Sequence, residues 1–279
     1  MPIRTDLAIE AKQLWEKSAE KTTKLEGVRA RTYHVGDNEL TRVEILDERG
    51  ERALGKPVGR YITLELPRSR EIRGPAEALA GELRRLTDGP GSVMVVGLGN
   101  AAVTPDALGP LAASRLFLTR HLIEHLPEQF GSCRSVCAVC PGVLATTGIE
   151  SAELVRGAVA HTKPSCVIVI DALATGAAER LCRTVQLTDT GIVPGSGVGN
   201  RRSGFSQKTL GVPVLALGAA TVTDAAALCP DADGQMIVTP RDIDEQVRYL
   251  AAVLAAAINL ALHPELSYEE LAQFVPNCS

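Results

Sequence analysis

The stretch VMVVGLGNAAVTPDALGP, residues 93–110, decides the fold expected for this chain. It begins as an apolar run typical of a buried strand, breaks at a glycine-rich turn, and then opens an Ala- and Leu-rich segment typical of a helix. A strand followed directly by a helix is the unit of open α/β sheets, whose binding crevices lie at the carboxyl ends of the strands. Asp106, at the start of the expected helix, is therefore predicted to face such a crevice.

A second acid follows a second apolar run. The run CVIVI, residues 166–170, ends at Asp171, and a carboxylate at that depth is unfavourable unless it is paired or hydrogen bonded. If the two strand ends are adjacent, Asp106 and Asp171 cannot both ionise easily, so one pKa rises and the pair supplies an acid and a base. Two structural roles stay open: Asp106 in the first turn of a helix, and Asp171 as the N-cap of a short helix over residues 172–180.

Composition defines the broad class of protein. The 279 residues are 45% hydrophobic and 22% charged, as in a soluble globular chain. A net charge of −4 and only 3% aromatic residues argue against a nucleic-acid-binding surface. The longest apolar stretch, residues 250–262, is shorter than the roughly 20 residues that a membrane span needs, so it is expected to be a buried helix. No secretory signal is visible at the start, which indicates a cytoplasmic protein.

The order of patterns predicts an α/β fold in a single domain over residues 1–279. Residues 28–67 have period two and predict a small antiparallel meander, after an amphipathic helix over residues 5–19. From Glu77 onward helices and strands alternate, which predicts a three-layer α/β/α sandwich with a mixed, mainly parallel sheet. The helices are expected at 78–86, 107–126, 152–161, near 223 and at 240–262, and the strands at 93–96, 135–139, 166–170 and 212–217.

Two glycine-rich segments are candidate substrate-binding loops. Gly97, Gly99 and Asn100 follow a strand without a third glycine or a GK[ST] sequence, so they indicate backbone N–H donors to an oxyanion more than a nucleotide site. The second segment, TDTGIVPGSGVGNRR, spans residues 188–202 and has the length of a lid or ligand cradle.

Within the second segment, four residues are singled out. Gly195 and Gly197 are expected to approach the substrate closely because glycine has no side chain. Arg201 and Arg202 end the loop, and their guanidinium groups suit an acidic side chain of the substrate.

Cysteine and histidine patterns give weak signals for metal. Seven cysteines, an odd number, indicate a reducing compartment. Cys137 and Cys140 have C-x-x-C spacing, but in a strand they point to opposite faces, so buried and inert thiols are favoured over a metal or redox pair. His121 and His125 have helical metal spacing without an accompanying acid motif, so a structural placement is favoured. No cofactor is predicted from these patterns.

An alternative to a metal-free pair stays open. Asp106, Asp171 and Asp189 together would offer oxygen ligands to a hard divalent cation.

Several motifs, in order over nearly the whole chain, resemble those of one family, the germination protease of spore-forming bacteria. The motifs are GRYITLE (59–65), VGLGN and VTPDALGP (96–110), IDALA (170–174), DTGIVPGSGVGN (189–200) and TVTDA (221–225). The resemblance implies an endopeptidase of the spore core that degrades small acid-soluble spore proteins during germination. It also implies a self-processing zymogen, a homotetramer and a fold related to the hydrogenase-maturation peptidases. The family's proposed catalytic aspartates correspond to Asp106 and Asp171, and the family has been classed both as aspartic-like and as metal-dependent.

The chain departs from that family at two places. Met1 and Pro2 directly precede IRTDLA, where zymogens of the family carry a short propeptide. Two alternatives stay open: self-processing control is absent, or the sequence starts near the mature N-terminus. Between residues 227 and 238 the chain lacks a long insertion that the family carries, and this difference is expected to affect access to the site or assembly of the tetramer. Two rival functions stay open: a non-catalytic binder of spore proteins, and a sugar or nucleoside hydrolase on a similar sheet.

Overall fold

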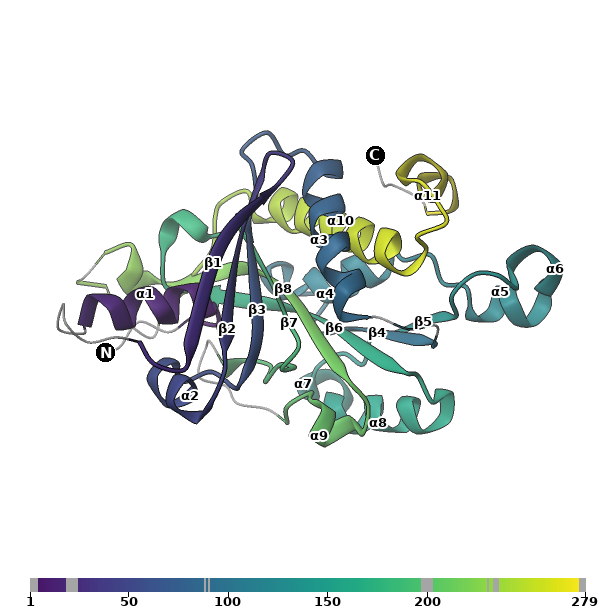
Figure 1. Cartoon of the computed structure of the whole chain (residues 1–279), viewed down its shortest axis with the longest axis horizontal. Coiled ribbons are helices and arrows are strands. Elements are labelled where there is room, and N and C mark those ends of the chain that lie inside the picture. Colours follow the sequence, from purple (N-terminus) through teal and green to yellow (C-terminus); the bar gives the residue numbers. More distant parts are fainter. Residues whose placement is uncertain are drawn as a thin grey trace.

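The protein is described from a computed structural model, which places residues 5–18, 25–87, 89, 91–196, 203–229, 231–232 and 236–275. A single mixed sheet runs through the molecule, with helices on both of its faces (Figure 1). Its strands lie in the order β1 (Val28–Val35), β2 (Asn38–Ile45), β3 (Gly59–Glu65), β7 (Thr184–Thr188), β8 (Val214–Asp224), β6 (Cys166–Thr175), β4 (Val93–Gly97) and β5 (Val136–Val139), and β9 (Ile237–Val238) pairs with β8.

The sheet has a parallel part and an antiparallel part. Strands β8, β6, β4 and β5 run parallel to one another, whereas β1, β2, β3 and β7 pair antiparallel, as do β7 with β8 and β8 with β9. The meander expected over residues 28–67 is present, and β3 joins it to the rest of the sheet by pairing with β7. The α/β class and the mixed sheet predicted from the sequence are confirmed.

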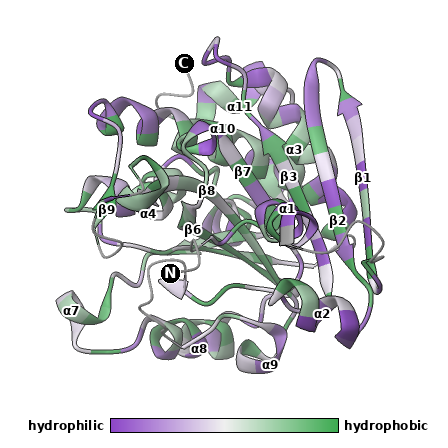
Figure 2. Ribbon diagram, turned by 90° about the vertical axis from the view of Figure 1, so that its left-hand side faces the viewer, coloured by the Kyte–Doolittle hydropathy of each residue, from purple (hydrophilic) through white to green (hydrophobic). Residues whose placement is uncertain are grey.

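Alternating side chains on the parallel strands create the two outer layers. Val93 and Val95 of β4 pack into one apolar cluster with the helices above the sheet, whereas Met94 and Val96 pack into a second cluster on the opposite face. Figure 2 shows both helical layers edge-on to the sheet. The upper layer contains α3 (Arg73–Leu86), α4 (Leu108–Ala113) and α10 (Ile243–Leu262), and the lower layer contains α7 (Leu144–Thr147), α8 (Ser151–Thr162) and α9 (Gln207–Leu210).

The remaining helices lie at the margins of the sandwich. A third, smaller apolar cluster joins the first helix to the meander. The helices at the margins are α1 (Ala8–Ser18), α2 (Glu48–Leu54), α5 (Arg120–His125), α6 (Pro127–Phe130) and α11 (Tyr268–Phe274).

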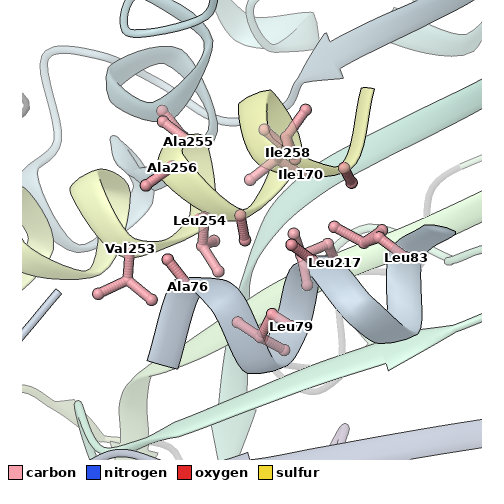
Figure 3. Close-up of a cluster of buried hydrophobic side chains, with 14 of the residues drawn as sticks. Ala76, Leu79, Leu83, Ile170, Leu217, Val253, Leu254, Ala255, Ala256 and Ile258 are labelled. Atoms are coloured by element: carbon pink, nitrogen blue, oxygen red, sulfur yellow. The ribbon is translucent and has the colours of Figure 1, made fainter. Parts of the chain in front are cut away.

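Helix α10 is the centre of the larger core. Every residue from Leu250 to Leu262 is buried, and the helix packs on α3 above Ile170 of β6 and Leu217 of β8 (Figure 3). Each fully buried Leu, Ile or Val contributes about 1.5–3 kcal/mol through the hydrophobic effect. Among the described residues α10 alone is long and apolar enough to cross a membrane, and 78% of its apolar window is buried inside the protein. The buried helix predicted for this stretch is confirmed.

The long helix predicted over residues 107–126 is wrong. Helix α4 ends at Ala113, and the chain then follows tertiary hydrogen bonds until α5 begins at Arg120. The Phe117 N–H donates to Asn259 Oδ1 at 2.9 Å, and the Thr119 N–H donates to the carbonyl of Val136 at 3.1 Å. These contacts with α10 and β5 replace the helical ones, which helical periodicity alone does not reveal.

Two further expected helices are replaced by extended strands. Strand β6 continues to Thr175, so the helix expected over residues 172–180 is reduced to one 3₁₀ turn at Ala178–Arg180. Strand β8 continues to Asp224, so the helix expected near residue 223 is one 3₁₀ turn at Ala225–Ala227. Both strands extend because they pair with each other over this length.

Candidate active site

Asp106 lies on a 3₁₀ turn, Thr104–Asp106, that directly follows the loop after β4. Its Oδ2 accepts the backbone N–H of Asn100 at 2.7 Å, so the carboxylate faces back toward the glycine turn. Helix α4 begins two residues later, and its N-cap Ala107 has no side-chain cap hydrogen bond. The Asp106 carboxylate therefore binds the Asn100 N–H of the preceding loop and does not cap the start of helix α4.

Gly99 makes this arrangement possible. Its φ of +112° is rarely adopted by residues with a side chain, and a Cβ atom there would overlap the carbonyl oxygen of Asp106. Gly97 has a different role: a Cβ on it would overlap the carbonyl oxygen of Gly109, so it allows α4 to pack on β4. Close backbone approach at Gly99 therefore positions Asp106, and close approach at Gly97 positions α4.

Asp171 lies within β6 and not at its end. Gly97, the last residue of β4, pairs with Ile170, and the Leu98 N–H donates to the Ile170 carbonyl at 2.9 Å. Asp171 is thus the first β6 residue beyond the end of β4, and it is 5% exposed. Its Oδ1 accepts the N–H of Ala172 at 2.9 Å, so the expected role as a helix N-cap is wrong.

The two carboxyl groups interact. Burial raises the pKa of Asp171 well above its ordinary value, and the charges of Asp106 and, to a smaller extent, Asp6 raise it further. Burial also raises the pKa of Asp106, while the Asn100 N–H opposes that rise by stabilising the charged form. The proton is therefore held preferentially on the more buried Asp171, whose pKa both burial and the charge of Asp106 raise.

Both acids line a cavity of about 510 Å³ whose wall is mostly apolar. Gly99, Asn100 and Gly195 lie in this wall as expected, but the Asn100 N–H already binds Asp106. Gly97 is not part of the wall. Other lining residues include Leu98, Val103, Val143, Leu144, Phe205 and Thr221.

Three predicted substrate-binding residues, Gly197, Arg201 and Arg202, lie outside the described residues. The described segments on either side of these residues form an antiparallel bridge, in which Ile192 and Phe205 exchange two backbone hydrogen bonds at 2.9 and 2.7 Å. Gly195 and Phe205 of this loop reach the cavity.

Asp189 does not join the other two acids. Its carboxylate accepts the Nε–H of Arg60 at 2.7 Å and the backbone N–H of Arg60 at 2.7 Å, away from the cavity. The three-aspartate metal site is therefore wrong. No group of three or more His, Cys, Asp or Glu side chains suited to a metal occurs in the described part of the chain, and Asp106 and Asp171 alone do not make a three-ligand site.

The other metal and redox candidates lie away from the cavity. Cys137 is half-buried on β5 and Cys140 is exposed just after it, so the predicted burial is wrong for Cys140. Desolvation raises the pKa of both thiols, which keeps them protonated. His121 and His125 are exposed on α5.

One residue beside the site was missed by the sequence reasoning. The Asp6 carboxylate accepts the N–H of Ala174 at 2.9 Å and the hydroxyl of Ser196 at 2.8 Å, which ties the N-terminal segment to β6 and to the glycine loop. Lys56 and Gln186 also donate to the Asp6 carbonyl, each at 3.1 Å. The motif IRTDLA carried this signal, but helical periodicity assigned Asp6 to the solvent-facing side of a helix.

An α/β sheet that brings two carboxyl groups to one cavity is an arrangement suited to the acid–base chemistry of a hydrolase. The model of one family, described as germination protease, matches residues 8–237. The chain belongs to the germination protease family, and it is therefore a peptidase, an enzyme that hydrolyses peptide bonds.

Individual relatives agree over nearly the whole chain. A germination protease of Caldanaerobacter subterraneus subsp. tengcongensis is 42% identical over 98% of each chain. One of Clostridium tetani is 37% identical over 99% of this chain and 100% of its own. The Caldanaerobacter alignment has 322 positions, more than the 279 residues here, so that relative contains residues with no counterpart in this chain.

Among solved structures, the [NiFe] hydrogenase maturation protease HycI of Thermococcus kodakarensis aligns with a TM-score of 0.38 and 19% identity. The alignment covers 64% of this chain and 99% of that one.

Proposed function

We propose that this enzyme is the endopeptidase that begins the degradation of small acid-soluble spore proteins during germination, with Asp106 and Asp171 as its acid–base pair. Family membership supports the biological role. The observation that carries the mechanism is the interaction of the two carboxyl groups within one cavity. The proposal includes action in the cytoplasm of the spore core, as a homotetramer.

In the first step, the ionised Asp106 takes a proton from a water molecule while the water oxygen attacks the carbonyl carbon of the peptide. Asp106 suits this role because it is only half-buried and the Asn100 N–H stabilises its negative charge. Asp171, which holds its proton in a buried position, donates that proton to the carbonyl oxygen. The product of this step is a neutral tetrahedral diol.

In the second step, the diol collapses and the C–N bond breaks. Asp106 gives its proton to the leaving nitrogen, and Asp171 recovers a proton from a hydroxyl group as the carbonyl re-forms. One water molecule is consumed, and both carboxyl groups return to their starting protonation states.

Acid–base catalysis of this kind contributes roughly 10²–10⁴ in rate, or about 3–5 kcal/mol. Enzymes commonly lower the barrier by about 8 kcal/mol or more, so positioning and charge stabilisation supply the rest. The apolar cavity wall favours both effects because it limits the access of bulk water.

The test is cleavage of a purified small acid-soluble spore protein by the wild type, Asp106→Asn and Asp171→Asn, each with and without chelator. We expect discrete cleavage by the wild type and a loss of about 100-fold or more in both folded variants. Asp189→Asn is the matched control, because Asp189 pairs with Arg60 outside the cavity and should retain activity. Normal cleavage by the two cavity variants would contradict the mechanism.

The same preparation distinguishes the rival functions. A non-catalytic binder would retain the spore protein without cutting it, and a glycoside hydrolase would act on small glycosides. Loss of cleavage in chelator, restored by one metal, would favour the metal-dependent alternative.

Substrate choice is proposed to depend on the loop after Asp189. Arg201 and Arg202 are proposed to bind an acidic side chain of the substrate, with Gly195 and Gly197 allowing close approach of the peptide. An Arg201→Ala variant with an unchanged cleavage-site preference would contradict this assignment.

A further inference from the structure

Thr221 on β8 is a buried threonine in the wall of the cavity that holds Asp106 and Asp171. Its exposed fraction is 0%, and its hydroxyl has no hydrogen-bond partner among the described residues. A buried hydroxyl without a partner is unfavourable by about 1–3 kcal/mol, and valine has the same shape without that penalty. Because Thr221 also lies in the cavity wall, a bound ligand can supply the partner that its hydroxyl lacks.

A β-bulge places Thr221 at this position. Leu173 of β6 pairs with Ala220 and Ala174 pairs with Val222, so Thr221 is the extra residue without a partner opposite it. Figure 2 shows β6 and β8 side by side in the middle layer. Bulges redirect side chains and occur frequently next to active sites. Because of the bulge, two consecutive residues, Thr221 and Val222, both line the cavity.

Two other donors in the same wall are already engaged. The Asn100 N–H donates to Asp106 at 2.7 Å, and the Ser151 hydroxyl donates to the Gly142 carbonyl at 2.8 Å. The backbone of Thr221 is also fixed, because the Thr239 hydroxyl donates to its carbonyl at 3.0 Å. The Thr221 side chain is thus held in a rigid strand with its own donor uncommitted.

We infer that the Thr221 hydroxyl is a substrate-contacting group that donates a hydrogen bond to the carbonyl oxygen of the peptide bond being cleaved. Negative charge develops on this oxygen as water attacks, and a fixed donor stabilises that charge in a site that excludes water. A bound peptide supplies the partner that Thr221 lacks within the protein. The inference rests on the proposed peptidase mechanism at this cavity.

The experiment compares Thr221→Val, Thr221→Ser and the control Thr63→Val in steady-state cleavage of the spore protein. Thr63 is a matched control because it is a strand threonine, 1% exposed, whose hydroxyl also lacks a partner, and it lies outside this cavity. We expect Thr221→Val to lower kcat by about 100-fold with little change in KM, as for loss of one oxyanion donor. Thr221→Ser should restore most of kcat, and Thr63→Val should match the wild type.

Thermal unfolding separates this role from a structural one. Both valine variants should unfold at or above the wild-type temperature, since each removes an unpartnered buried hydroxyl. A lower unfolding temperature for Thr221→Val, with a kcat that serine does not restore, would indicate a packing role and overturn the inference. Should the valine variant not fold, Thr221→Ala takes its place with the same expected loss in kcat.

Asp106→Asn in the same assay separates a failure of the inference about Thr221 from a failure of the proposed function. If Asp106→Asn is inactive and Thr221→Val has wild-type kcat, only the inference about Thr221 fails. If Asp106→Asn retains full activity, or the wild type does not cleave, the proposed function fails and the inference fails with it.

Discussion

Asp6 and Ala174 exchange two hydrogen bonds, one in each direction. The Asp6 N–H donates to the Ala174 carbonyl at 3.0 Å, and the Ala174 N–H donates to the Asp6 carboxylate at 2.9 Å. The N-terminal segment therefore pairs with β6 three residues beyond Asp171, and its negative charge acts on that acid.

The first prediction concerns this charge. Asp6→Asn keeps the shape of the side chain but removes a charge that raises the pKa of Asp171. In the proposed mechanism Asp171 acts in its protonated form, so activity should fall as pH rises through that pKa, and a lower pKa should move this fall to lower pH. A profile of kcat/KM against pH should show the basic limb displaced by a fraction of a pH unit. Asp189→Asn should leave the limb in place, because Asp189 pairs with Arg60 and is not among the charges that act on Asp171. An unmoved limb in Asp6→Asn would contradict the prediction.

The second prediction is that the buried acid lowers stability at neutral pH. Because the pKa of Asp171 is raised in the folded protein, the unfolded chain releases this proton at lower pH than the folded one does. Stability from this group therefore falls as pH rises above the unfolded value of about 3.9. Asp171→Asn should have a higher Tm than the wild type at about pH 7, with a difference that shrinks toward about pH 4. A variant that is less stable at neutral pH would show that the carboxylate is better compensated than its burial indicates.

The third prediction tests the glycine turn. Gly99→Ala adds a methyl group that overlaps the Asp106 carbonyl, at a φ of +112°. The strained backbone alone is unfavourable by about 1–3 kcal/mol, and relief of the overlap displaces Asp106. Both unfolding free energy and cleavage should therefore decrease. Gly36→Ala separates the two causes, because Gly36 shares a positive φ of +57° but has open space around it, so its variant should lose stability and keep activity.

The fourth prediction concerns a buried ion pair behind the site. Arg180 lies 3.5 Å from the carboxylate of Glu10, which also accepts the Gly176 N–H at 2.7 Å. Arg180→Met removes the guanidinium beside the buried carboxylate of Glu10 and also breaks the 3.1 Å pair with Glu65, so it should lower the free energy of unfolding by about 3 kcal/mol. Chemical denaturation measures this, with Lys12→Met as the control. Lys12 makes an exposed pair with Glu16 on α1, so its loss should change stability by less than about 0.5 kcal/mol.

The two acids could be located from the sequence because binding crevices in open α/β sheets lie at the carboxyl ends of the strands. Asp106 and Asp171 both follow apolar runs, and parallel pairing of β4 with β6 brings them to one cavity. The reasoning failed for Asp189, because its partner Arg60 lies 129 positions away and no local pattern links them.

The lengths of β6 and β8 and the bulge at Thr221 could not be predicted from local sequence patterns. The continuation of β6 to Thr175 depends on β8 and on the N-terminal segment, neither of which is local. Thr221 was missed for the same reason, since alternation of apolar residues assumes an unbroken register and a bulge breaks it.

The position of Asp171 in β6 bears on when its carboxyl group becomes exposed during thermal unfolding. β6 is hydrogen bonded to β8 on one side and to β4 on the other, and it lies between the two large apolar clusters. Such central strands open only when the whole domain unfolds, so their amide hydrogens are the slowest to exchange with solvent. Asp171 is therefore expected to leave its buried position only when the native fold is lost, so that its carboxyl group meets solvent in the same cooperative transition as the core.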